Sequence, residues 1–273
     1  MVEFESSKIS VSRQCDLLSI HRSGLYYKNV IMSDLKYEIM NEIDKCYTAY
    51  PFYGTRRMAL YLQTLGYKIG RKGVRSLCNI MGIAAIYPKG NPITTQSDDR
   101  HIKYPYLLRH LPITQRNQVW ATDITYIPMK KGFMYLCAII DLHTRYVLAW
   151  NISNTMNVEF VSQVLETALQ RYGNPEIFNT DQGSQFTSEK FTNILKNNDI
   201  RISMDGKCRA LDNIFIERLW RSVKYECVYL NAFEDGLSLR KGLEEYFNFY
   251  NHERKHQSLN YKTPYSCYFE SAA

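Results

Sequence analysis

The chain has 273 residues, of which 45% are hydrophobic, so it can form one large domain and a smaller one with a sizeable core. It contains no run of about 18 apolar residues, and its acidic start lacks the apolar segment of a signal peptide, so we expect a cytoplasmic protein with no membrane span. Seven cysteines without a Cys-x-x-Cys pair argue against a disulfide framework or a zinc site.

The net charge of +7 is distributed unevenly along the chain. Residues 51–118 contain eleven Lys or Arg and two Asp, a net charge of +9, so the remainder is slightly acidic. A basic segment joined to a nearly neutral one suggests a polyanionic partner, most simply nucleic acid. Charge alone is equally compatible with an ordinary solvated basic face.

The first third of the sequence predicts helices. Residues 1–28 suggest two short helices around a turn, and Ser33 and Asp34 can cap a helix that runs to about Tyr47. A further helix after Tyr53-Gly54-Thr55, a turn over residues 66–70 and a helix over 71–81 then form a helix-turn-helix pattern.

In a helix-turn-helix motif the second helix enters the major groove of DNA. Arg71, Lys72 and Arg75 lie near the start of that helix, where base or phosphate contacts are made. Arg56 and Arg57, on the preceding helix, are further candidate DNA contacts. The pattern does not decide which helix reads bases, and a plain pair of helices with a basic surface has similar spacing.

Residues 87–117 have the composition of a linker, which divides a helical DNA-binding region, 1–86, from a core domain, 118–273. The core begins with three strands in a meander, followed by alternating helices and strands. This order predicts an α/β fold, in which a mixed five-stranded sheet is covered by helices on both faces. The expected strands are 119–127, 133–141, 146–152, 176–179 and 199–203, and the expected helices are 156–172, 189–197, one around Glu217 and a long final one.

Three acids of this core suggest catalysis. Asp123 lies on the first strand, which should be central, and Asp181 follows the fourth strand, so the two should be neighbours. The helix that carries Glu217 should cross beside them. Carboxylates that converge without a cation repel one another, and they usually bind a divalent metal such as Mg²⁺. Taken singly, each acid has a plainer interpretation as a turn, a strand cap or a surface ion-pair partner.

The helix around Glu217 has two predicted faces. Phe215, Leu219 and Val223 recur every four residues and should pack against the protein. The opposite face should present one acid, one aromatic residue and two cations that could grip a phosphodiester: Glu217, Trp220, Arg221 and Lys224.

Two other acids compete with these three. Asp141 precedes a predicted hairpin turn, where an Asp side chain commonly accepts a hydrogen bond from the backbone. Asp212 is well placed as the N-cap of the helix that contains Glu217. Both are therefore ranked as structural residues.

Four stretches together resemble the signature of insertion-sequence-3 family transposases, in which two Asp and one Glu are catalytic. The interval between Asp181 and Glu217 contains 35 residues, the spacing that this family shares with retroviral integrases. The matching stretches are Trp120–Tyr126, Ile140-Asp141, Asn179–Phe186 and Asp212–Arg218. Residues 250–264 also resemble the closing motif of the family, and residues 53–57 resemble its upstream helix-turn-helix segment.

The resemblance implies a ribonuclease-H-like catalytic domain with two Mg²⁺ or Mn²⁺ ions bound by Asp123, Asp181 and Glu217. It implies cleavage and strand transfer at the ends of an insertion sequence in bacterial nucleoid DNA, with Arg221 and Lys224 contacting DNA. It also implies a homo-oligomer on DNA and an upstream-frame helix-turn-helix protein as fusion or partner. Asn179 differs from many family members, which have His there.

Two other functions are compatible with parts of the sequence. A DNA-binding regulator or inactive remnant would use the basic helices without chemistry, but the three acids are intact. A nuclease of the ribonuclease H type would have less need of the basic helical region.

Overall fold

The computed structural model describes residues 2–4, 9–26, 32–86, 104–130, 132–205 and 214–270. The chain divides into two compact units, Met1–Ala84 and Ala85–Ala273. The first part of the predicted linker, 87–103, and the predicted helix cap Asp212 lie outside the described residues. Among the helices in these ranges, none has the length and apolar character needed to cross a membrane.

The first unit is helical. It contains α1 (Val11–Leu17), α2 (Arg22–Leu25), α3 (Asp34–Ala49), α4 (Thr55–Thr64) and α5 (Arg71–Met81). Helices α3 to α5 share one apolar core, in which Ile43, Leu62 and Val74 are fully buried. Helix α5 ends at Gly82, whose φ of 69° is left-handed and therefore favours glycine. The predicted helix-turn-helix of α4 and α5 is thus present.

The second unit is built on a five-stranded mixed sheet in the order β3-β2-β1-β4-β5. The first three strands pair antiparallel, whereas β1–β4 and β4–β5 pair parallel. The prediction of a mixed sheet with the first strand at its centre is confirmed. The strands are β1 (Val119–Pro128), β2 (Phe133–Asp141), β3 (Val147–Ser153), β4 (Ile177–Thr180) and β5 (Arg201–Met204).

The last strand begins two residues later than predicted. Asp199 has a φ of 56°, which is left-handed and incompatible with extended backbone. Its strand therefore starts at Arg201.

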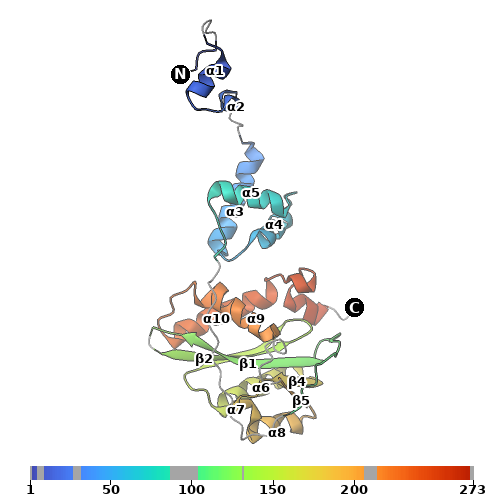
Figure 1. The fold of residues 1–273 in the computed structure, drawn as a ribbon. Coiled ribbons are helices and arrows are strands. Elements are labelled where there is room, and N and C mark those ends of the chain that lie inside the picture. The colour runs from blue at the N-terminus through green and yellow to red at the C-terminus, as the bar shows by residue number, and fades with distance from the viewer. Residues whose placement is uncertain are drawn as a thin grey trace. The chain divides into compact units, whose positions relative to one another are not determined.

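Helices cover both faces of the sheet, as predicted (Figure 1). One face carries α6 (Val158–Tyr172), α7 (Ser184–Thr187) and α8 (Glu189–Asn197), and the other carries α9 (Ile214–Val223) and α10 (Gly236–His252). Side chains of β1 alternate between the two cores, because Trp120 packs with α6 whereas Ala121 packs with α9 and α10.

Helix α9 continues into a π-helix, η1 (Lys224–Val228), which is tied to the C-terminal segment by a buried ion pair. Arg254 Nε and Nη2 donate to the two carboxylate oxygens of Glu226 at 2.6 and 2.7 Å. The hydroxyl of Tyr246, on α10, donates to the same carboxylate at 2.9 Å. Arg254 Nη2 also donates to Ser222 Oγ of α9 at 3.0 Å. This network fixes the end of α9 against α10.

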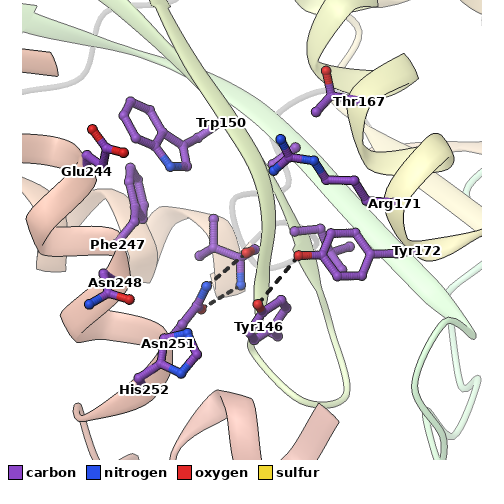
Figure 2. Close-up of a pocket in the computed structure, with 13 residues that line it drawn as sticks. Tyr146, Trp150, Thr167, Arg171, Tyr172, Glu244, Phe247, Asn248, Asn251 and His252 are labelled. Atoms are coloured by element: carbon purple, nitrogen blue, oxygen red, sulfur yellow. Dashed lines mark hydrogen bonds between the residues drawn. The ribbon is translucent and has the colours of Figure 1, made fainter. Parts of the chain in front are cut away.

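The edge strand β3 is held by a side chain of α10. Asn251 Oδ1 accepts from the backbone N–H of Val147 at 2.9 Å, and its Nδ2 donates to the Val147 carbonyl at 3.0 Å (Figure 2). A hollow of about 260 Å³ lies beside these bonds, between β3, α6 and α10. Its wall includes Arg171 and Glu244, and none of the predicted site residues lines it.

We predict that Arg254→Met destabilises the protein by about 3 kcal/mol or more, because it removes the guanidinium that donates two hydrogen bonds to the buried Glu226 carboxylate. Urea unfolding measures this change. The matched control is Lys190→Met, which breaks the exposed pair between Lys190 and Glu159 and should have little effect. Equal midpoints for the two variants would contradict a structural role for the buried pair.

Candidate active site

The register of the three parallel strands aligns three aspartates. Asp123, Asp181 and Asp205 each lie two residues beyond positions that are paired across β1, β4 and β5. The paired positions are Ala121 with Asn179, and Asn179 with Ser203. Parallel strands advance by the same rise per residue, so the three aspartates lie at the same level along three neighbouring strands of the sheet. The sequence prediction that Asp123 and Asp181 are neighbours agrees with this register.

Asp123 accepts two hydrogen bonds. Its Oδ1 accepts from the backbone N–H of Ile124 at 2.7 Å, and its Oδ2 accepts from the indole Nε1 of Trp220 at 2.9 Å. Burial of the carboxyl group and the nearby charge of Asp181, with a smaller effect of Asp205, raise the pKa of Asp123 to about 7 against the opposing effect of these bonds. The site therefore destabilises the charged form of Asp123.

Asp181 is placed by a tight turn after β4. Its Oδ1 accepts from the backbone N–H of Gly183 at 2.9 Å, and burial raises the pKa of its carboxyl group. A Cβ atom on Gly183 would lie 3.0 Å from that same Oδ1. Glycine at this position therefore leaves room for the carboxylate.

Asp205, which sequence reasoning missed, braces the Asp181 turn from both sides. Its backbone N–H donates to the Thr180 carbonyl at 2.9 Å, and its own carbonyl accepts from Gln182 Nε2 at 2.7 Å. Its Oδ1 accepts from Asn179 Nδ2 at 2.9 Å. The only sequence signal was its offset from Ser203, which has meaning once the strand pairing is known.

Asn179 is fully buried, and both ends of its amide are hydrogen-bonded. Its Nδ2 donates to Asp205, while its Oδ1 accepts from Ser203 Oγ at 2.8 Å. In this chain the residue therefore joins β4 to β5 beside the Asp181 turn.

Helix α9 packs with the predicted ridge, since Leu219 and Val223 are buried and Phe215 packs against the same core, but its buried face is wider than predicted. Trp220 was expected on the outward face, but it is 6% exposed and bonds to Asp123, so that prediction is wrong. The buried residues recur at i, i+3, i+4 and i+7: Ile216, Leu219, Trp220 and Val223. Glu217 lies in the first turn of α9, and most of its side chain is exposed. The part that is buried raises the pKa of its carboxyl group.

The structure brings Asp123 and Asp181 together but does not gather Glu217 into a three-acid group with them. In the described ranges, no three Asp, Glu, His or Cys side chains are arranged to hold a metal ion. The two aspartates nevertheless fit a divalent cation, because they offer only oxygen ligands and repel each other. Neither forms an ion pair with a Lys, Arg or His among the residues that the structure describes.

The predicted cations lie in both units. Lys224 is half-buried at the start of η1, directly after α9, where burial lowers its pKa and the charge of Asp123 opposes that effect. Arg221 is exposed on α9. On α5 the exposed side chains include Arg71, Lys72 and Arg75; on α4, Arg56 is exposed and the Arg57 guanidinium lies 5.4 Å from the centre of the Tyr53 ring.

Asp141 has the structural role that the sequence predicted. Its Oδ1 accepts from the backbone N–H and the hydroxyl of Thr144, both at 2.7 Å. Its Oδ2 accepts from the backbone N–H of Asn117 at 2.8 Å. These three donors hold the β2–β3 turn.

Comparison with known proteins connects this arrangement to a family. Models of the integrase core domain match residues 113–210 and 198–264, and a model of an HTH-like domain matches residues 34–90. The transposase for insertion sequence element IS904 of Lactococcus lactis subsp. lactis (strain IL1403) is 31% identical over 219 residues, which are 78% of this chain and 85% of that protein. Transposase InsF for insertion sequence IS3A of Escherichia coli (strain K12) is 27% identical over 266 residues, which are 93% of this chain and 92% of that protein.

A solved structure shares the fold. It is the simian T-cell lymphotropic virus intasome in complex with PP2A regulatory subunit B56 gamma, with a TM-score of 0.52 and 15% sequence identity. The match covers 84% of this chain and 74% of that one.

The integrase-core matches and the fold define a ribonuclease-H-like polynucleotidyl transferase, a class that uses a divalent metal and acts on DNA. The chain belongs to the insertion-sequence-3 family of transposases. Its function is DNA transposition, with the DNA integration and recombination that this entails.

We predict that Asp123→Asn stabilises the metal-free protein by roughly 2 kcal/mol at about pH 8. The native state keeps its Asp123 proton up to about pH 7, whereas the unfolded chain loses it near the ordinary value of 3.8. Stability therefore falls as the pH rises through this window, and the gain from Asn should vanish near the lower end. Urea unfolding in the presence of a chelator, at about pH 8 and again at the lower end of this window, measures the difference in the free energy of unfolding between the variant and the parent protein.

The control is Asp141→Asn, which places an amide NH₂ group among three hydrogen-bond donors and should destabilise the protein at both pH values. A stability difference between Asp123→Asn and the parent protein that is the same at both pH values would contradict the raised pKa of Asp123, because the loss of a hydrogen bond does not depend on pH in this window.

Proposed function

We propose that Asp123, Asp181 and Glu217 bind two Mg²⁺ or Mn²⁺ ions and carry DNA strand cleavage and strand transfer at the ends of an insertion sequence. The observation that supports this most is the parallel register of β1 and β4, which aligns Asp123 with Asp181. Mutual repulsion of these carboxylates has no evident structural use, but a bound divalent cation relieves it. Glu217 supplies the third carboxylate from α9.

When bound, the two ions activate an attacking oxygen and stabilise the leaving oxygen of an in-line phosphoryl transfer. Water first hydrolyses the phosphodiester at the end of the element and leaves a 3′-hydroxyl group. This hydroxyl then attacks a phosphodiester of the target DNA, which breaks one P–O bond of the target strand and releases the target 3′-hydroxyl, so the protein supplies no nucleophile. Arg221 and Lys224, one and two turns beyond Glu217, contact the phosphates and keep the reacting strand beside the acids.

We further propose that residues 1–86 recognise the terminal repeats, with 87–117 as a linker to the catalytic core, 118–273. Exposed cations of α5 would read the major groove, and Arg56 and Arg57 of α4 would contact phosphates. The active species is a homo-oligomer on DNA, with an upstream-frame helix-turn-helix protein as fusion or partner. A regulatory role without chemistry is the alternative that the first test separates.

Glu217→Gln should abolish cleavage and joining of a labelled terminal-repeat duplex in Mg²⁺, by at least about 100-fold, while DNA binding is kept. The substitution keeps the size of the side chain and removes its charge. Glu166→Gln, at an exposed position of α6, is the control and should be fully active. Wild-type activity of Glu217→Gln, or cleavage of RNA–DNA hybrids by the parent protein, would contradict the proposed role.

If the parent protein binds the duplex without cutting it, the upstream-frame protein is added. Activity that then appears identifies this chain as one half of the transposase. Inactivity in its presence identifies a regulator.

On the DNA-binding side, Arg75→Ala should weaken binding to the terminal repeat about tenfold or more and relax its sequence preference. Lys72→Ala should weaken binding to all sequences and lower the slope of log affinity against log salt by about 1. Lys36→Ala, an exposed cation on α3, serves as the control. Fluorescence anisotropy over a range of salt concentrations reports both effects. Unchanged binding by both α5 variants would place DNA recognition elsewhere.

A further inference from the structure

The bond between Trp220 and Asp123 joins the helix of one predicted catalytic acid to the strand of another. The donor and acceptor are 97 residues apart in the sequence, on α9 and β1. A buried indole N–H needs a hydrogen-bond acceptor, and most backbone carbonyls could serve. Here the acceptor is the carboxylate of Asp123, at 2.9 Å.

The position of Trp220 on α9 relates this bond to Glu217. Glu217, Trp220 and Lys224 follow the spacing i, i+3 and i+7, so they share one stripe of the helix. Trp220 touches Asp123, and Lys224, one turn later, interacts electrostatically with the same carboxylate. The stripe therefore runs past Asp123, with Glu217 one turn before the bond.

Other directional contacts hold the two ends of α9: the Arg145 guanidinium lies 3.5 Å from the centre of the Phe215 ring, and Arg254 donates to Ser222. Its apolar face packs through Ile216, Leu219 and Val223, and apolar contact is not directional. Among the residues that the structure describes, the Trp220 bond is the one side-chain hydrogen bond between α9 and a strand. A slip of one helical turn, about 5.4 Å, would break it and displace Glu217 by the same distance.

We propose that Trp220 is a positioning residue of the transposition reaction, whose indole N–H orients the Asp123 carboxylate and holds α9 where Glu217 can join the metal site. The proposal rests on the metal-site assignment made above. In this role Trp220 neither contacts DNA nor takes part in the reaction. The plain alternative is that Trp220 only fills the core, in which case its N–H is dispensable.

The variant Trp220→Phe separates these two roles, because it keeps an aromatic ring and removes the N–H. The matched control is Trp120→Phe. Trp120 is also buried, lies on β1 and donates its indole N–H to Asn117 Oδ1 at 3.0 Å, which is not a proposed metal ligand. Both variants lose one indole bond, but only one of these bonds ends on a proposed metal ligand.

Rates of joining are measured for both variants with the terminal-repeat duplex, well below their melting temperatures. For Trp220→Phe we expect a fall in kcat of about tenfold or more and a severalfold higher half-saturating Mn²⁺ concentration, with KM for the duplex unchanged. Trp120→Phe should match the parent protein in all three. Equal behaviour of the two variants overturns the positioning role.

A second readout needs no change at Trp220. In a protein with Trp120→Phe and Trp150→Phe, Trp220 is the single tryptophan, since the chain has three. With the duplex bound, Mn²⁺ should quench its emission saturably, and Asp123→Asn should abolish the quenching. Absence of quenching while joining proceeds overturns the proposal, because a metal bound by Asp123 must lie beside the indole.

The two proposals can fail separately. If Glu217→Gln joins ends normally, the metal-site assignment is wrong whatever Trp220 does. If Glu217→Gln is inactive but Trp220→Phe behaves like Trp120→Phe, the assignment stands and Trp220 is a core residue only.

Discussion

Repulsion between aligned carboxylates is the constraint on which the core domain depends. The parallel pairing of β1 with β4, and of β4 with β5, puts Asp123, Asp181 and Asp205 at one level. Burial and the charge of Asp181 disfavour ionisation of Asp123. A sheet that served only stability would not place acids in this way, because each pKa raised above its unfolded value weakens the fold at neutral pH. The arrangement is therefore understandable as a binding site for a cation.

Much of the surrounding structure holds these acids in place. Trp220 donates to Asp123, Gly183 donates to Asp181, and Asp205 braces the turn that carries Asp181. At the other end of α9, the buried pair of Glu226 and Arg254 ties the helix to α10 and to the segment after it. The closing motif of the sequence thus has a structural explanation, because its Arg254 neutralises Glu226 and the preceding Asn251 secures β3. The two ends of α9 are anchored by different means, one at the site and one in the core.

The sequence predicted the sheet, its central strand and the proximity of Asp123 to Asp181, because these follow from alternation of side chains and from strand order. It misassigned Trp220, because the spacing of four residues from Phe215 finds the ridge of Leu219 and Val223 but not the full width of the buried face. That face also includes Ile216 and Trp220. Asp205 could not be found in one dimension, since its importance comes from the register of strands distant in sequence. The buried ion pair escaped notice for the same reason, because its partners are 28 positions apart in the sequence.

The central claim is that Asp123, Asp181 and Glu217 form one metal site, although the described residues contain no three-acid group arranged to hold a metal. The most direct measurement is a crystal structure of the protein bound to its terminal-repeat DNA and soaked in Mn²⁺, with anomalous diffraction to locate the metal. The account predicts anomalous peaks between Asp123 and Asp181, with Glu217 drawn in as a ligand. Peaks at other acids, or occupied peaks with Glu217 still turned to solvent, would contradict it.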